Sequence, residues 1–117
     1  MTDFMLASGS QIRRQVLEGA GVPFSVDKPD VDESAIKARR SELDPADMAL
    51  VLGRAKAEAV STRRPGALVL GADQTMELDG QLLDKLPRAD LARERLLAMR
   101  GRAHHLHSGL ALCRDGA

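Results

Sequence analysis

Asp73 is the residue of this sequence that is best placed for chemistry, because its carboxylate follows an apolar run at 67–70. That run, followed by Gly71 and Ala72, predicts a buried strand that ends just before the carboxylate. Open α/β sheets bind ligands at the carboxyl ends of their strands. Asp73 and Gln74 are therefore candidates for a site at the rim of a sheet. The alternative is a turn aspartate that hydrogen-bonds nearby backbone, and this stretch alone leaves both open.

A candidate phosphate-binding loop lies near the start of the chain. An apolar run at 4–7, the loop 8–10 and the helically spaced apolar residues that follow predict a strand, a tight loop and a helix. Backbone N–H groups at the start of such a helix attract phosphate, and Arg13 and Arg14 add forked donors suited to it. Cations at a helix N-terminus are unfavourable unless an anion binds there. A solvated basic face is the alternative.

Two further groups of charged residues are candidates for ligand binding. Asp30, Asp32 and Glu33 bring three carboxylates into four positions. Carboxylates suit a hard cation such as Mg²⁺, which usually takes one or two of them together with substrate phosphates. From these residues alone, a solvated turn that caps the next helix is the preferred interpretation. Lys56 lies beside the apolar stripe of a later helix, where a lysine usually extends to water.

That later helix is the clearest one in the sequence. Asp44 is its predicted N-cap and Pro45 its first residue. The residues expected on its core face recur at helical spacing: Met48, Val51, Leu52, Ala55 and Ala59.

The second half of the chain predicts a hairpin, a helix and a last strand. Asp79-Gly80 between short apolar runs indicates a two-residue hairpin, a helix follows Asp90, and 104–113 is the strand. On that strand Leu106, Leu110 and Leu112 share one face, and His105 and His107 share the other. Zinc needs three or four protein ligands, so a half-exposed strand face is preferred over a zinc site.

The composition limits the classes of function. With 117 residues the chain fits one domain, residues 1–117. Seventeen basic residues balance seventeen acidic ones, and only two residues are aromatic, which argues against nucleic acid as a partner. No apolar run approaches the roughly 18 residues of a membrane span. A single cysteine fits a reducing compartment, so a cytoplasmic protein without a membrane partner is predicted.

The order of elements predicts an α/β fold with a mixed β-sheet flanked by helices. Six segments resemble the successive motifs of the Maf family in order and spacing: 6–14, 29–33, 56–60, 71–74, 79–80 and 101–109. The resemblance covers nearly the whole chain. It implies a fold like that of inosine triphosphate pyrophosphatase.

The resemblance also implies an activity and a set of site residues. Maf proteins cleave nucleoside triphosphates to the monophosphate and pyrophosphate with Mg²⁺ or Mn²⁺. By this resemblance Asp73 is the general base, and Glu33 helps to hold the metal. The residues implied to contact the triphosphate are Ser8, Arg13, Arg14, Lys56 and Lys85.

The base preference stays open. Gln74 and the position of Ile12 resemble the Maf members associated with 7-methyl-GTP, whereas members that prefer dTTP and UTP carry Thr after the aspartate. The 7-methyl-GTP group typically has Pro-Trp where this sequence has Gln11-Ile12, and a cationic methylated base is best held over an aromatic face.

Family members are considerably longer, so the sequence resembles the fold truncated on its C-terminal side. Two hypotheses follow: a working nucleotide pyrophosphatase, or a non-catalytic nucleotide-binding or regulatory fragment related to septum formation. The last strand is expected to keep an open edge and an apolar face. We therefore expect the chain to expose apolar surface or to self-associate, for example as a homodimer.

Overall fold

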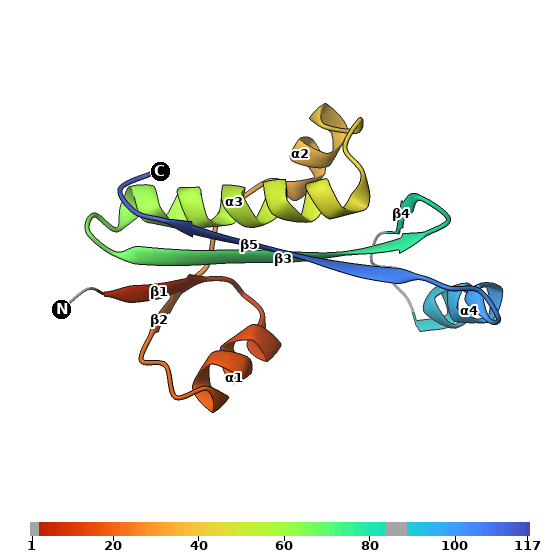
Figure 1. Ribbon diagram of the computed structural model, residues 1–117, viewed down its shortest axis with the longest axis horizontal. Coiled ribbons are helices and arrows are strands. Elements are labelled where there is room, and N and C mark those ends of the chain that lie inside the picture. The colour runs from red at the N-terminus through yellow and green to blue at the C-terminus, as the bar shows by residue number, and fades with distance from the viewer. Residues whose placement is uncertain (1–2, 84–88) are drawn as a thin grey trace.

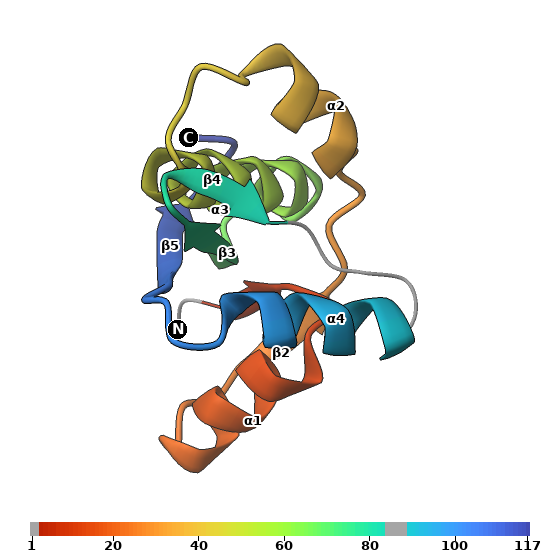
Figure 2. The same cartoon turned by 90° about the vertical axis from the view of Figure 1, so that its right-hand side faces the viewer.

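The computed structural model describes residues 3–83 and 89–117, which form a mixed β-sheet with helices on both sides (Figure 1). This confirms the α/β class. The elements in chain order are β1 (Phe4–Ala7), α1 (Gln11–Gly19), β2 (Ser25–Asp27), α2 (Glu33–Arg39), α3 (Pro45–Arg63), β3 (Leu68–Leu78), β4 (Gln81–Leu83), α4 (Ala89–Met99) and β5 (His105–Cys113). Figure 2 shows α2 and α3 on one side of the sheet and α1 on the other.

Strand β3 is the centre of the sheet and is longer than predicted. It does not end before Asp73 but runs on to Leu78. The reason is its antiparallel partner β5, which pairs with it from Val69 to Glu77 and so satisfies backbone groups well beyond Gly71. Asp73 is therefore a residue in the middle of a strand.

The other edge of β3 is interrupted. β1 runs parallel to β3 and its pairing stops where Ala7 meets Gly71. β4 pairs only from Met76 onward, after a two-residue turn in which Asp79 and Gly80 both have positive φ, 53° and 81°. This confirms the hairpin. Between the two partners, no strand formed by the described residues pairs with residues 72–75 of β3 on this edge, so the sheet opens there.

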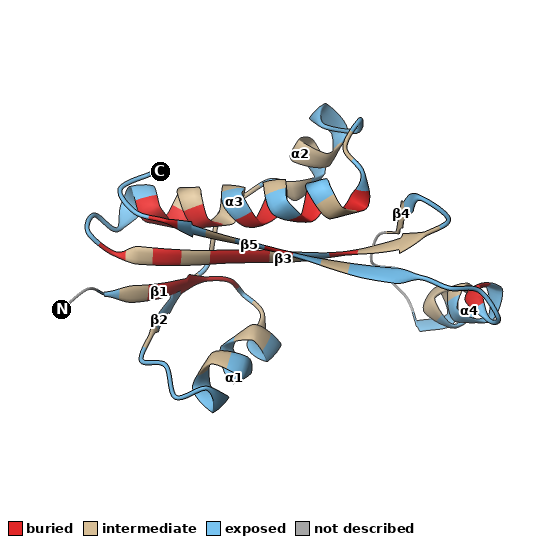
Figure 3. Cartoon of the chain, in the orientation of Figure 1, coloured by how far each residue is buried: buried red, intermediate tan, exposed pale blue. Residues whose placement is uncertain are grey.

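Helix α3 packs on β3 and β5 through its smallest residues. An added Cβ at Gly71 would stand 2.6 Å from the Ala57 backbone nitrogen, and one at Gly109 would stand 2.5 Å from the Leu50 nitrogen. Because of this close packing, the face of α3 that carries its small residues lies against the sheet, and Figure 3 shows this face as buried. The predicted core stripe is therefore partly wrong: Met48 and Leu52 are buried, but Val51, Ala55 and Ala59 are only half-buried. The remaining buried positions of the helix are Pro45, Ala49, Gly53, Ala57, Val60 and Ser61.

The opposite face of the sheet is thinly covered. No residue of α1 is buried, and Ile12 and Val16, expected on its packed face, are 73% and 65% exposed. Leu106, Leu110 and Leu112 are between 55% and 64% exposed. In the described part of the chain β5 pairs with β3 alone. The expected apolar face and open edge of this strand are thus confirmed.

Candidate active site

A cleft of about 1500 Å³ lies where the edge of β3 is interrupted. It has a charged end, built around Asp73 and the loop after β1, and an apolar end, built by β4, α4 and the start of β5. Among the described residues, five basic side chains line it against two carboxylates: Arg13, Lys28, Lys37, Lys56 and Arg95 against Glu33 and Asp73. Because the whole chain carries no net charge, this local excess of positive charge favours a polyanionic ligand at this place.

Lys56 joins the two carboxylates of the cleft. Its ammonium lies 2.8 Å from Asp73 Oδ1 and 3.1 Å from Glu33 Oε1. The side chains of Lys56 and Asp73 are each only 12% exposed, so the lysine does not extend to water. Three elements meet here, because Lys56 is on α3, Asp73 on β3 and Glu33 at the start of α2. Sequence spacing alone did not indicate this cluster, since its members come from distant parts of the chain.

In the acidic segment 30–33, Asp32 stabilises a helix and Glu33 lies in the site. The Asp32 side chain accepts a hydrogen bond from the Ala35 backbone at 3.0 Å and is the N-cap of α2. That cap places Glu33 in the first turn, where its carboxylate reaches Lys56. The structure therefore supports the capping role for Asp32 and places Glu33 at the cleft.

The loop after β1 presents Ser8 and Arg13 to the same cleft. Ser8 is buried, and its Oγ accepts hydrogen bonds from the Ser10 backbone at 2.9 Å and from Arg13 Nη1 at 3.5 Å. Ser10 is the N-cap of α1 and accepts from the Arg13 backbone at 3.3 Å. These contacts hold the arginine over the start of the helix, where an anion is favourable.

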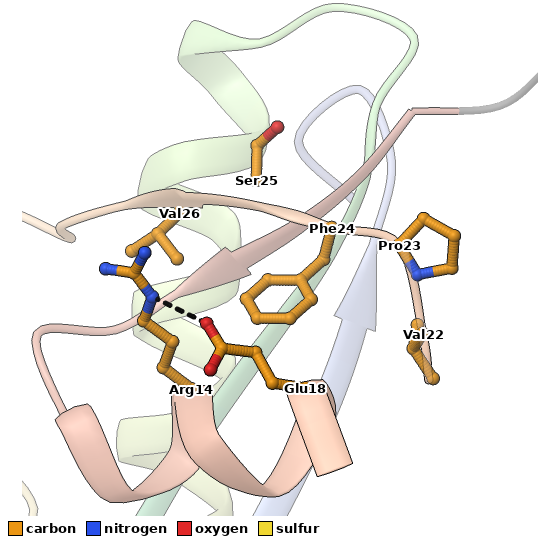
Figure 4. Close-up of a pocket in the computed structure, with 7 residues that line it drawn as sticks. All are labelled: Arg14, Glu18, Val22, Pro23, Phe24, Ser25 and Val26. Atoms are coloured by element: carbon orange, nitrogen blue, oxygen red, sulfur yellow. Dashed lines mark hydrogen bonds and ion pairs between the residues drawn. The ribbon is translucent and has the colours of Figure 1, made fainter. Parts of the chain in front are cut away.

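Arg14 does not line the cleft. Its Nε lies 3.2 Å from Glu18 Oε1, and both side chains are largely exposed. The arginine borders a separate hollow of about 550 Å³ between α1 and β2, where Phe24 also lies (Figure 4). Successive residues of a helix point about 100° apart, and in this structure Arg13 is directed to the cleft whereas Arg14 is directed to Glu18. Lys85, the other residue implied to bind phosphate, lies outside the described residues.

Both predicted specificity residues line the cleft. Gln74 Nε2 donates to Ser108 Oγ at 3.4 Å, across the β3–β5 pair, and Ile12 stands exposed at the border. The apolar end was missed by sequence reasoning, although short apolar runs flank the hairpin. Its residues are Met76, Leu82, Leu83, Ala92, Leu96, Met99 and Leu106.

Within the described residues, His105 and His107 are not grouped with further residues into a metal site. His107 Nε2 lies 3.5 Å from Glu77 Oε1, and the ring centroids of His105 and His107 are 6.1 Å apart. Within residues 3–83 and 89–117 no three or more His, Cys, Asp or Glu residues are grouped so that they could hold a metal ion. In the same part of the chain, no helix combines the length and the apolar character needed to cross a membrane.

The fold and the cleft define an α/β protein with a cation-lined site beside a carboxylate pair. The sequence matches the family of Maf-like proteins over residues 3–117, and the chain belongs to the Maf family.

Individual relatives carry names that specify an activity. The chain is 67% identical over 116 residues to a nucleoside triphosphate pyrophosphatase of Maricaulis maris, a match that covers 99% of this chain and 59% of that protein. It is 48% identical over 118 residues to the protein of the same name from Caulobacter vibrioides, with 99% and 59% covered. It is also 48% identical over 114 residues to a 7-methyl-GTP pyrophosphatase of Mesorhizobium japonicum, with 96% and 57% covered. The chain thus spans a little under three fifths of these relatives.

Proposed function

We propose that this protein acts as a nucleoside triphosphate pyrophosphatase, releasing pyrophosphate and a nucleoside monophosphate. The observation that carries the proposal is the half-buried cluster of Lys56, Asp73 and Glu33 inside a cleft with an excess of cations. The names of the Maf relatives favour the same activity.

The charged end of the cleft suits the triphosphate. Arg13 offers a forked donor beside the first turn of α1, and Lys28 and Lys37 add positive charge along the same wall. In this proposal Ser8 and Arg13 hold the phosphates together with Lys56. Arg14 does so only if the side chain leaves Glu18, and Lys85 retains the phosphate role that the family resemblance implies.

The carboxylates fit a divalent metal of the Mg²⁺ or Mn²⁺ type. Such ions are usually bound by one or two carboxylates together with substrate phosphates, and Asp73 with Glu33 is a donor set of that kind. When bound, the metal neutralises phosphate charge and makes its coordinated water more acidic.

The chain's own residues supply the rest of the chemistry. Water attacks the α-phosphorus, the bond from that phosphorus to the bridging oxygen breaks, and pyrophosphate leaves. In this proposal Asp73 also accepts the proton from the attacking water, and the pairing of β3 with β5 before and after this residue fixes its backbone. Arg13 and Lys56 stabilise the negative charge that develops on the leaving oxygens.

The apolar end suits the base. Gln74 offers both a donor and an acceptor at the junction of the two ends, and Ile12 borders the opening. Met76 and Met99 present polarizable sulfurs, whereas none of the described residues that line the cleft is aromatic. Since a cationic methylated base is best held over an aromatic face, this aliphatic lining gives 7-methylguanine no advantage over ordinary bases.

The test is release of pyrophosphate from a panel of dTTP, UTP, GTP and 7-methyl-GTP, each with Mg²⁺, with Mn²⁺ and with a chelator. We expect metal-dependent release from at least one triphosphate. Nucleotide binding without release under all these conditions would contradict the proposal and favour a non-catalytic binding role.

A further inference from the structure

We propose that Lys56 is a built-in counter-cation, which holds the carboxylates of Asp73 and Glu33 until a triphosphate enters and which competes with the divalent metal for them. The inference rests on the proposed function in one respect, since it takes these two carboxylates as the ligands of the metal. It adds that lysine and metal exclude one another, so that metal binding depends on the nucleotide.

The first argument is the position of the ammonium. It lies within 3.1 Å of an oxygen of each carboxylate. The side chains of Lys56 and Asp73 are each only 12% exposed. A half-buried ammonium needs such partners because it has lost most of its water. Lys56 and the two carboxylates therefore neutralise one another's charge without any further ion.

The second argument is competition for the same atoms. A hard cation binds through carboxylate oxygens, and the Asp73 Oδ1 and Glu33 Oε1 atoms are already engaged by the lysine. A divalent cation next to the ammonium would also be repelled by it. The metal on its own must therefore displace Lys56 and leave that half-buried ammonium without a partner.

The third argument is what a triphosphate changes. The cleft that contains Lys56 also carries Arg13, Lys28 and Lys37, so phosphate oxygens bound there give the displaced ammonium a new anionic partner. Triphosphate and metal then favour each other's binding, because the metal displaces Lys56 from the carboxylates and the triphosphate binds the displaced ammonium. The protein would take up free metal poorly and the metal with its nucleotide well.

The test measures Mn²⁺ binding without any nucleotide, from the loss of the electron paramagnetic resonance signal of free Mn²⁺. Lys56→Met removes the charge and keeps most of the side-chain length, and Lys56→Gln is a second neutral variant. The matched control is Arg54→Met on the same helix, because Arg54 is exposed and pairs with Glu58. Thermal melting followed by circular dichroism checks that each variant is folded.

We expect both Lys56 variants to bind Mn²⁺ about 10-fold tighter than the unmodified protein, within the usual range of such couplings, and Arg54→Met to leave the affinity unchanged. Adding Asp73→Asn to Lys56→Met should remove the gain. The inference is overturned if the Lys56 variants bind Mn²⁺ no tighter than Arg54→Met, or if the gain survives Asp73→Asn.

A second measurement uses the unmodified chain. Acetylation of lysines, read by mass spectrometry with Lys28 as internal reference, should label Lys56 slowly without metal and faster at saturating Mn²⁺. Equal labelling of Lys56 in both conditions would overturn the inference. These results are independent of turnover: absence of pyrophosphate release contradicts the proposed function, whereas absence of competition contradicts the role of Lys56.

Discussion

Gly53 of α3 and Gly109 of β5 lie so close that a Cβ atom on Gly53 would stand 2.8 Å from the Gly109 carbonyl oxygen. This contact sets the distance between the helix and the sheet. Lys56 lies about one helical turn after Gly53, and the contact brings it within 2.8 Å of Asp73. Packing of backbone against backbone thus positions the charged centre of the cleft.

We predict that Gly109→Ala and Gly53→Ala both destabilise the fold, with Gly109→Ala the more damaging. Overpacking of this kind costs roughly 1–3 kcal/mol, and neither neighbour is a flexible side chain that could move aside. In Gly53→Ala the better helix propensity of alanine offsets roughly 1 kcal/mol of that cost. Urea unfolding measures the free energies of unfolding.

The matched control is Gly19→Ala in α1, where an added Cβ meets nothing within 4 Å. It should leave stability equal or slightly raised. If all three alanine variants unfold at the same urea concentration, the close approach of α3 to the sheet does not limit stability.

Local signals were sufficient to predict several elements from the sequence. The first strand lies at Phe4–Ala7 as expected, and Asp44 caps α3 by accepting from the Asp47 backbone at 2.8 Å. The Asp79-Gly80 turn is also as predicted. Each depends on residues adjacent in sequence, such as a cap with its first turn or a turn residue with positive φ.

What could not be predicted depends on partners far away in the chain. The extension of β3 past Gly71 is due to β5, and the rotation of α3 is due to glycines in two strands. The charged centre unites residues from α2, α3 and β3. The different directions of Arg13 and Arg14 also depend on their partners, because Arg13 reaches Ser8 and Arg14 reaches Glu18.

Asp73→Asn is predicted to abolish pyrophosphate release while leaving nucleotide binding in the absence of metal largely intact, because the amide keeps the shape of the side chain but accepts a proton poorly. Loss of a general base typically lowers the rate by about 10²–10⁴-fold. Turnover is measured by pyrophosphate release and binding by titration calorimetry. Undiminished release in this variant would move the base to Glu33 or to another group.

Arg13→Ala and Arg14→Ala should behave differently. Arg13 lines the cleft, and loss of a charged hydrogen bond to phosphate weakens binding by roughly 1.5–3 kcal/mol, which corresponds to an increase in KM of about 10-fold or more. Arg14 pairs with Glu18 outside the cleft, so its removal should change KM little. Steady-state kinetics of the two variants decides, and an equal rise in KM for both would mean that Arg14 turns into the cleft when substrate binds.

Stability should fall in acid partly through Asp27. The side-chain hydrogen bond from Arg64, together with the charge and hydrogen bond of Arg63, lowers the pKa of Asp27 below its ordinary value of 3.8. A carboxyl group whose pKa is lower in the folded state stabilises the fold above the unfolded-state pKa. That contribution is lost as the pH falls through the lower, folded-state pKa.

The measurement is urea unfolding at a series of pH values from neutral to strongly acidic. Asp27→Asn should lower stability at neutral pH and flatten the acid branch of the profile, whereas Asp30→Asn, three residues along the same segment, should keep that branch. An Asp27→Asn profile parallel to that of the unmodified chain would show that the Arg63–Asp27–Arg64 contacts do not contribute to acid sensitivity.

Gln74→Thr is predicted to change which triphosphate is preferred. Gln74 lines the cleft and reaches across the sheet to Ser108 Oγ at 3.4 Å. Its amide can donate and accept at once along the edge of a base, whereas a threonine hydroxyl is shorter and cannot make the same pair of contacts.

Ser108→Ala serves as the control, because it removes the partner of Gln74 and keeps the amide. The comparison is the ranking of kcat/KM over the panel of triphosphates. We expect the ranking to change in Gln74→Thr and to hold in Ser108→Ala, and an identical ranking in both variants and the unmodified protein would show that Gln74 does not contact the base.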